Sequence, residues 1–203
     1  RKDGKLYYLK YPVRLEPEGF ATARPSLIVA TTRPETMLGD TAVAVNPKDE
    51  RYKYMIGRTI ELPLTNRAIP IVGDEYVDPE FGTGAVKVTP AHAPNDYQLG
   101  LRHNLEQLLI MNDDGTMNAA AGADFEGLDR FKAREKVVEQ FEELGLLERV
   151  EDYEITLPVC ERCKTIVEPI LSDQWFVKMH DSQRPGEGMR DMALELMRTE
   201  GVP

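Results

Sequence analysis

Short runs of β-branched and aromatic residues recur along the first half of the chain, separated by Gly, Pro, Asn and Asp. Runs bounded in this way are typical of β-strands. The intervals between them are too short for a helical crossover, which favours antiparallel or mixed pairing and disfavours a doubly wound Rossmann sheet. We expect strands at Lys5–Val13, Ser26–Thr31, Thr41–Val45, Thr59–Leu64, Ala68–Val72 and Gly84–Thr89.

Helical periodicity follows the strands. Shorter helices are expected at residues 94–103 and 188–198. The clearest helix runs from an N-cap at Asp129 to Leu144, with Gly145 after its end and an apolar face of Phe131, Val137, Val138, Phe141 and Leu144. Together the elements predict a mixed α and β fold: a curled, largely antiparallel, barrel-like β core with peripheral helices.

Composition narrows the function classes. The chain has 203 residues, enough for one substantial core or two small ones, and it lacks an apolar run long enough for a membrane helix. Its formal charge of −10 is the wrong sign for wrapping duplex nucleic acid. With only two cysteines and a start that is neither a signal peptide nor a methionine, we expect an intracellular protein and a piece of a larger chain.

A first candidate cluster lies at residues 30–41, where an apolar strand runs into two hydroxyls, a guanidinium and a proline turn. At such a strand end, Thr31, Thr32 and Arg33 can present hydrogen-bond donors to a ligand. The alternative is a pair of strand threonines before an ordinary surface turn. The pattern alone leaves both open.

A second cluster follows from alternation along the last expected strand. Val86 and Val88 share an apolar face, whereas Lys87 and Thr89 share the opposite one. This polar face either lines a pocket or faces solvent. Asp96 falls in the first turn of the next helix, where the helix dipole favours a carboxylate whatever its function.

The third cluster is the pair Cys160 and Cys163, separated by two residues. Such a pair can be half of a tetrahedral zinc site, a redox pair or two reduced surface thiols. His92, His103 and His180 have no metal-ligand spacing among themselves. One cysteine pair cannot complete a zinc site by itself.

Taken in order, the longer strings resemble the editing domain inserted in the class I aminoacyl-tRNA synthetases for valine, isoleucine and leucine. Glu35 after Arg-Pro, together with Lys87-Val88-Thr89, resembles the valine type. The ATP-site motifs His-x-Gly-His and Lys-Met-Ser-Lys-Ser are absent from this sequence, so we do not expect amino-acid activation. The resemblance covers residues 6–179 and is carried by Ala30–Asp40, Phe81–His92, Gly127–Phe131 and Gln174–Met179.

The resemblance implies a hydrolase that removes threonine from mischarged Thr-tRNA(Val), with threonyl-adenylate as a further substrate. It would use a water molecule, without a protein nucleophile or a cofactor. It implies that Asp96 binds the α-ammonium group and that Lys87 and Thr89 bond the substrate carbonyl or hydroxyl. Thr31 and Thr32 would act in catalysis with Lys87 and Asp96.

Further binding residues are implied in the same way. Arg33 would supply donors near the ester and the terminal adenosine, while Asp40 and Phe81 would complete the pocket. His92 would position water, although a buried structural histidine is an equal alternative. Ala93 stands where the valine type has Asp, which puts selection of the threonine hydroxyl in doubt.

Domain organisation and partners complete these expectations. The resemblance implies an editing domain at residues 1–179 and a helical segment at 180–203 leading back toward an absent catalytic domain. Cys160 and Cys163 would be half of a zinc site in the full-length parent, and the excised domain should bind zinc weakly or not at all. The expected partners are the threonine-bearing 3′ end of tRNA(Val) and the rest of a cytoplasmic synthetase, with no membrane. The alternatives are a module that binds the tRNA 3′ end without hydrolysis, or an editing domain of isoleucine or leucine specificity.

Overall fold

The computed structural model describes residues 2–14, 25–175, 179 and 188–199. The chain divides into two compact units, Arg1–Leu171 and Ser172–Pro203. The second unit contains helix α3 (Met189–Thr199), which confirms the helix expected there. The domain boundary expected at residue 179 stays a prediction, and Phe176–Lys178 and His180 lie outside the described residues.

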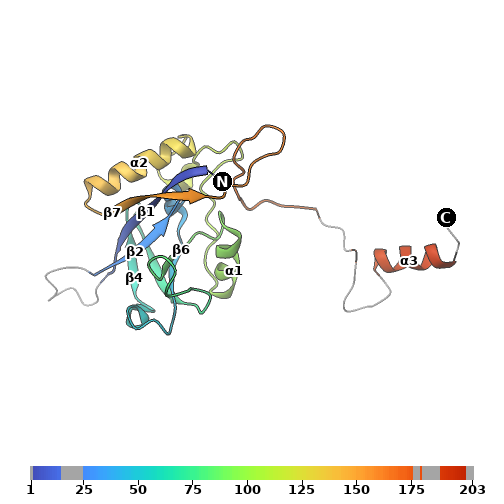
Figure 1. Cartoon of the computed structure of the whole chain (residues 1–203), viewed down its shortest axis with the longest axis horizontal. Coiled ribbons are helices and arrows are strands. Elements are labelled where there is room, and N and C mark those ends of the chain that lie inside the picture. The colour runs from blue at the N-terminus through green and yellow to red at the C-terminus, as the bar shows by residue number, and fades with distance from the viewer. Residues whose placement is uncertain (1, 15–24, 176–178, 180–187, 200–203) are drawn as a thin grey trace. The chain divides into compact units, whose positions relative to one another are not determined.

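The first sheet of the larger unit is three-stranded, in the order β2-β1-β7, and its pairings are antiparallel. Strand β1 (Lys2–Pro12) lies in the centre, between β2 (Ser26–Thr31) and β7 (Leu147–Ile155), as Figure 1 shows. Strands β1 and β2 were expected from the sequence. Strand β7 was not, because most of its side chains are exposed and carry no apolar alternation.

The second sheet has four strands in the order β4-β5-β3-β6. Strand β3 pairs antiparallel with β6 but parallel with β5, so the sheet is mixed. The two sheets do not close into a barrel, which corrects the barrel-like part of the expectation, while the mixed α and β class is confirmed. The strands are β3 (Ala42–Val45), β4 (Thr59–Leu62), β5 (Arg67–Gly73) and β6 (Ala85–Val88).

Strand β3 is buried on both faces and separates two apolar clusters. Val43 and Val45 belong to the large core, which also takes in residues of β1, β2, β4, β5 and β6, of one α-helix and of three 3-10 helices. Ala42 and Ala44 belong to the smaller cluster, with Leu99 of the neighbouring helix. Alternation of side chains along one strand thus supplies both cores.

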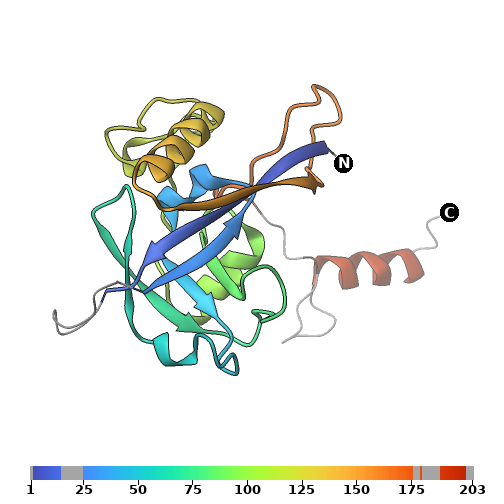
Figure 2. The same ribbon diagram turned by 60° about the vertical axis from the view of Figure 1, so that its left-hand side comes forward.

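Helix α2 (Arg130–Glu143) packs near β7 and the 3-10 helix η1 (Pro34–Gly39) (Figure 2). The expected N-cap is confirmed, because Asp129 Oδ1 accepts the Phe131 N–H at 2.8 Å. The expected burial of Val137 and Phe141 is confirmed, whereas Phe131 and Leu144 are exposed. Spacing by four residues adds Ala133 to the buried face.

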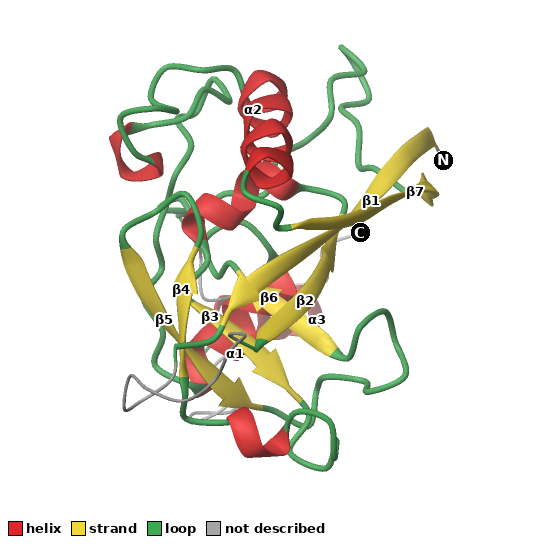
Figure 3. Ribbon diagram, turned by 90° about the vertical axis from the view of Figure 1, so that its left-hand side faces the viewer, coloured by secondary structure: helices red, strands yellow, loops and turns green. Residues whose placement is uncertain are grey.

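Helix α1 (Pro94–Arg102) follows β6 and packs against it (Figure 3). Two short 3-10 helices complete the unit, η2 (Lys53–Met55) and η3 (Ala119–Ala121). No helix within the described part of the chain is both long enough and apolar enough to cross a membrane.

Candidate functional site

The candidate site lies where the end of η1 and the β3–β6 pair meet the start of α1. The antiparallel register places Ala42 opposite Val88. This pairing brings Asp40, just before β3, beside Lys87 and Thr89 at the end of β6. Residues far apart in the sequence therefore share one location because two strands pair.

A buried hydrogen-bond cluster centres on the Asp40 carboxylate. Its Oδ1 accepts from the Lys87 ammonium at 2.8 Å and from the Thr89 hydroxyl at 2.6 Å, and its Oδ2 accepts from the Tyr11 hydroxyl at 2.7 Å. The Lys87 ammonium also donates to Thr89 Oγ1 at 2.5 Å. Lys87, the most accessible of the four, is only 9% exposed. The expected polar face of β6 therefore points into the protein and not to bulk solvent.

Protonation follows from this burial. Burial raises the pKa of Asp40, while the Lys87 ammonium and the hydrogen bonds donated to the carboxylate act in the opposite direction. Burial also raises the pKa of Tyr11 well above its usual value, so its hydroxyl stays protonated and donates. Both carboxylate oxygens of Asp40 are thus occupied by protein donors.

The remaining hydrogen-bonding capacity has a definite direction. A hydroxyl carries one proton, and that of Thr89 goes to Asp40, so toward a ligand Thr89 can only accept. An ammonium has three N–H groups, and Lys87 uses two of them within the cluster. The site therefore offers a ligand one cationic donor and one neutral acceptor.

Asp96 lies in the first turn of α1, beside this cluster. Its Oδ2 accepts the backbone N–H of Thr89 at 2.9 Å. Burial raises the pKa of Asp96, and the Lys87 ammonium partly offsets that rise. The residue as a whole is half-buried, and its binding of a ligand stays a prediction.

Thr31, Thr32 and Arg33 are half-buried at the end of β2. Thr31 Oγ1 accepts the backbone N–H of Arg33 at 3.1 Å, and the Arg33 guanidinium donates to the His92 carbonyl at 3.0 Å. His92 belongs to the connection between β6 and α1. This end of β2 is therefore tied to the same connection that holds Thr89 and leads to Asp96.

His92 and Phe81 lie in opposite environments. His92 is buried, and its Nε2 accepts the backbone N–H of Ile110 at 3.1 Å. Burial, with the positive charges of Arg33 and Lys87, lowers the pKa of His92 to about 4, which keeps the ring neutral. The Nε2 contact is structural, while the positioning of water by His92 stays a prediction. Phe81 is 70% exposed on the loop before β6, open to a ligand.

Several side chains support the site in ways that were not predicted from the sequence. Tyr11 donates to the Asp40 carboxylate, and Arg67 donates to the backbone carbonyl of Asp40 at 2.8 Å. Fully buried Glu35 accepts two hydrogen bonds of 2.7 Å from Arg134. Glu168 pairs with a site arginine that is 135 residues away in the sequence. No local sequence pattern reveals partners at such separations.

Cys160 and Cys163 lie on a hairpin in which the Lys164 N–H donates to the Cys160 carbonyl at 2.9 Å. Hydrogen bonding with Thr165 lowers the pKa of Cys163 to about 7, which favours the thiolate form that binds zinc. Within the described ranges, no group of three or more His, Cys, Asp or Glu side chains is arranged to hold a metal ion. The pair fits two of the four ligands of a thiolate zinc site, and zinc binding stays a prediction for a longer protein.

Known proteins resemble this chain closely. The family described as "Leucyl-tRNA synthetase, editing domain" matches residues 48–142. Valine–tRNA ligase of Carboxydothermus hydrogenoformans is 55% identical over 184 residues, covering 91% of this chain and 20% of that protein. The valine–tRNA ligases of Bacillus subtilis and Thermotoga maritima are 52% and 57% identical, over 97% and 85% of this chain and 21% and 19% of their own lengths.

A solved structure shares the fold. The crystal structure of GlLeuRS-CP1 superposes with a TM-score of 0.57 at 14% sequence identity, over 73% of this chain and 100% of that one. The present chain spans about a fifth of the length of the curated relatives it matches.

Proposed function

We propose that this chain, which belongs to the editing-domain family of the valyl-tRNA synthetases, hydrolyses the ester that joins threonine to a wrongly charged valine tRNA. Threonyl-adenylate is a second candidate substrate of the same site. One observation carries the proposal: the buried cluster of Asp40, Lys87 and Thr89 next to the carboxylate of half-buried Asp96.

The chemical need for such a site is well defined. Threonine and valine are the standard example of two nearly isosteric amino acids that an apolar pocket separates only weakly, because the pocket cannot strongly reject an added hydroxyl. A second site that requires a polar side chain removes the wrong product. The buried polar side chains of Lys87 and Thr89 suit that requirement.

The donors and acceptors of the site match an aminoacyl ester. We assign the α-ammonium to Asp96, since a carboxylate is its natural partner. The third N–H of Lys87 bonds the ester carbonyl and stabilises the negative charge that develops on its oxygen. Thr89, restricted to accepting, accepts a hydrogen bond from the ammonium or from the threonine hydroxyl. Asp40 then holds Lys87 and Thr89 and does not touch the substrate.

The reaction needs water and no protein nucleophile. A water molecule attacks the ester carbonyl, the bond between that carbon and the ribose oxygen breaks, and the proton lost by the water ends on the ribose oxygen. The products are free threonine and uncharged tRNA. Thr31 and Thr32 supply polar groups beside the ester, and Arg33 with Phe81 binds the terminal adenosine. No cofactor takes part in this scheme.

The partners follow from the same assignment. The 3′ end of tRNA(Val) enters as a single strand, which a chain with a formal charge of −10 can accept locally through Arg33 and an exposed aromatic ring. The rest of a cytoplasmic synthetase holds the tRNA body. Any zinc in that protein would use Cys160 and Cys163 with a second cysteine pair.

One observation favours a different function. Ala93, at the start of α1, offers no carboxylate to read the threonine hydroxyl. A module that binds the tRNA end without hydrolysing it is therefore the second candidate. The match to the leucyl-tRNA synthetase editing-domain family makes a sibling editing specificity the third candidate.

Deacylation assays separate these candidates. The chain, within its full-length protein, is given Thr-tRNA(Val), Val-tRNA(Val) and a mischarged tRNA of the isoleucine or leucine system. The proposal expects fast loss of threonine, slow loss of valine and little action on the third substrate. Binding of every tRNA without deacylation would favour the binding module, and preference for the third substrate would favour a sibling specificity.

A further inference from the structure

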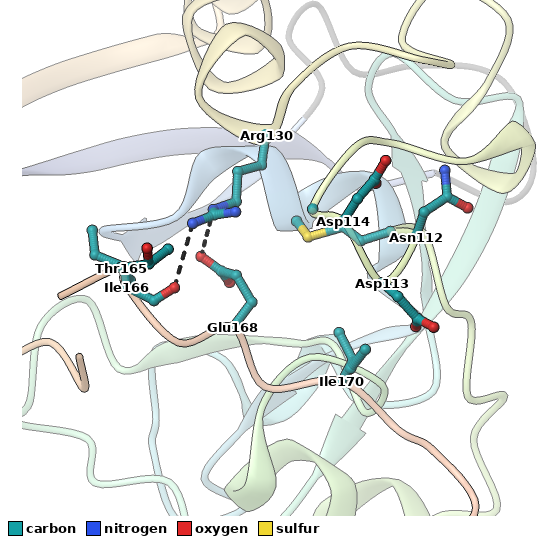
Figure 4. A pocket seen from close by; sticks show the side chains of 10 residues that line it. Asn112, Asp113, Asp114, Arg130, Thr165, Ile166, Glu168 and Ile170 are labelled. Atoms are coloured by element: carbon teal, nitrogen blue, oxygen red, sulfur yellow. Dashed lines mark hydrogen bonds and ion pairs between the residues drawn. The ribbon is translucent and has the colours of Figure 1, made fainter. Parts of the chain in front are cut away.

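The Glu168 carboxylate lies between two arginines from different parts of the chain. Its Oε1 is 3.0 Å from Nε of Arg130, at the start of α2, and its Oε2 pairs with Nη2 of Arg33 at the end of β2. Figure 4 shows Glu168 and Arg130 facing each other on the wall of a cavity of about 200 Å³. Arg130 also donates to the Ile166 carbonyl at 3.4 Å.

This carboxylate is the close anionic partner of Arg33. The other anion near the guanidinium is Glu35, whose Oε1 is 3.8 Å from Arg33 Nε. Glu35 is already engaged by Arg134 through two hydrogen bonds of 2.7 Å. Glu168 is 13% exposed and Arg33 is 21% exposed, so water screens their attraction only partly.

We infer that Glu168 is a positioning residue: it sets the direction of the Arg33 guanidinium, so that the groups of Arg33 that remain exposed meet the tRNA end. This inference rests on the proposed function, because it takes Arg33 as a contact for the terminal nucleotide. Glu168 itself touches no substrate in this account. Its effect passes through Arg33 alone.

The location of Glu168 gives the contact a consequence. It follows the hairpin of Cys160 and Cys163 and lies three residues before Leu171, where the first compact unit ends. The segment that leads out of the unit therefore contributes a partner to the candidate site. In a longer protein, the placement of this segment would therefore affect the orientation of the Arg33 guanidinium.

A purely structural role is the competing explanation, since Glu168 also fixes its own segment to α2 through Arg130. The two roles differ in what Glu168→Gln changes. Loss of an anchor lowers stability without altering how tRNA binds. Loss of Arg33 positioning weakens productive binding of the tRNA end even when the fold is intact, and misplacement by about 1 Å is enough to cost up to a hundredfold.

The experiment compares Glu168→Gln with Glu161→Gln. Glu161 is an exposed residue of the same hairpin, so its variant makes the same change of charge and size. Two quantities are measured: KM and kcat for Thr-tRNA(Val) hydrolysis in the full-length protein, and the NMR signals of the Arg33 guanidinium in this chain. For Glu168→Gln we expect KM to rise about ten- to a hundredfold with kcat less affected, and the Arg33 signals to shift and exchange faster with water. Glu161→Gln should match the unsubstituted protein in both.

Two results would overturn the inference. One is an unchanged Arg33 signal in Glu168→Gln, and the other is a changed signal with an unchanged KM. If the unsubstituted protein hydrolyses no Thr-tRNA(Val), the proposed function fails. In that case KM is replaced by the dissociation constant for uncharged tRNA(Val), and the same rise is expected from Glu168→Gln.

Discussion

The Asp40 carboxylate determines which way the hydrogen bonds of the candidate site run. Tyr11, Lys87 and Thr89 all donate to it, so it leaves Thr89 as an acceptor and Lys87 with one N–H for a ligand. The resemblance placed Asp40 against the substrate. Its complete burial supports the proposal that Asp40 holds Lys87 and Thr89, while contact with the substrate stays a prediction.

Removing the Tyr11 hydroxyl tests how much its hydrogen bond to Asp40 contributes to the stability of the fold. Tyr11→Phe leaves a buried carboxylate oxygen without a partner, which costs about 1 to 3 kcal/mol. Urea denaturation measures the loss in free energy of unfolding. Tyr54→Phe, at a tyrosine that is 59% exposed, is the matched control and should be neutral. Equal stability of the two variants would show that Tyr11 does not support Asp40.

His92 gives the fold a specific pH dependence. Its pKa is lowered to about 4 in the folded chain, whereas the unfolded chain takes up a proton near the usual 6.5. Between these values the unfolded state binds more protons, so stability falls as pH decreases. The contribution is complete above pH 6.5 and is lost progressively toward pH 4.

Replacing His92 by Gln tests this directly, because a glutamine oxygen can still accept the Ile110 N–H. Between pH 7 and pH 5 the unsubstituted chain should lose about 2 kcal/mol more unfolding free energy than His92→Gln. Urea titrations at the two pH values supply the comparison. Parallel losses in both proteins would mean that His92 is protonated normally in the folded state.

The N-cap position of helix α1 is occupied by a residue that cannot cap the helix with its side chain. Ala93 is the N-cap, with the extended backbone that an N-cap needs (φ −145°, ψ 126°), but it provides no side-chain acceptor. The aspartate that the valine type has here would therefore cap the helix as well as face the site. Two effects of one side chain need separate measurements.

Ala93→Asp should raise the free energy of unfolding by about 1 kcal/mol through capping. One added hydrogen bond to the threonine hydroxyl should also raise the preference for Thr-tRNA(Val) over Val-tRNA(Val) by about 1 kcal/mol. Urea denaturation and the ratio of the two deacylation rates measure these separately. A more stable protein with an unchanged ratio would assign position 93 to the helix alone, and crowding with Asp96 would lower the ratio.

Local sequence patterns predicted most of the helices and strands and part of the candidate site. Strands β1 to β6, α1 and α2 lie close to their expected positions because apolar alternation and capping residues are local signals. Strand β7 was not predicted, because its side chains are mostly exposed and its partner, β1, is distant in the sequence. The parallel β3–β5 pair likewise depends on tertiary packing and not on either strand's own pattern.

The same limit applies to the site. Strand alternation correctly put Lys87 and Thr89 on one face, and the helix start put Asp96 nearby. The sequence did not predict which groups donate and which accept in the Asp40 cluster, because one of the donors, Tyr11, comes from another sheet. Glu168 was missed for the same reason.

At the scale of the whole molecule, the side chains of the candidate site come from the end of β2, from the end of η1, from β6 and α1, and from the segment that contains Glu168. Hydrolysis should therefore depend on one carboxylate held by a buried framework. Asp96 is that carboxylate, but its Oδ2 also accepts the Thr89 N–H. Asp96→Ala would remove both functions, whereas Asp96→Asn keeps the oxygen acceptor and removes only the charge.

The decisive measurement is single-turnover hydrolysis of Thr-tRNA(Val) by the full-length protein, by its Asp96→Asn variant and by Asp124→Asn, which removes an exposed carboxylate elsewhere. Loss of a charge-assisted hydrogen bond to the α-ammonium should slow Asp96→Asn roughly ten- to a hundredfold, with Asp124→Asn unaffected. Since burial raises the pKa of Asp96, activity of the unsubstituted protein should fall at a higher pH than for an ordinary aspartate. Hydrolysis at the same rate by Asp96→Asn and the unsubstituted protein would contradict the assignment of this site as the editing centre.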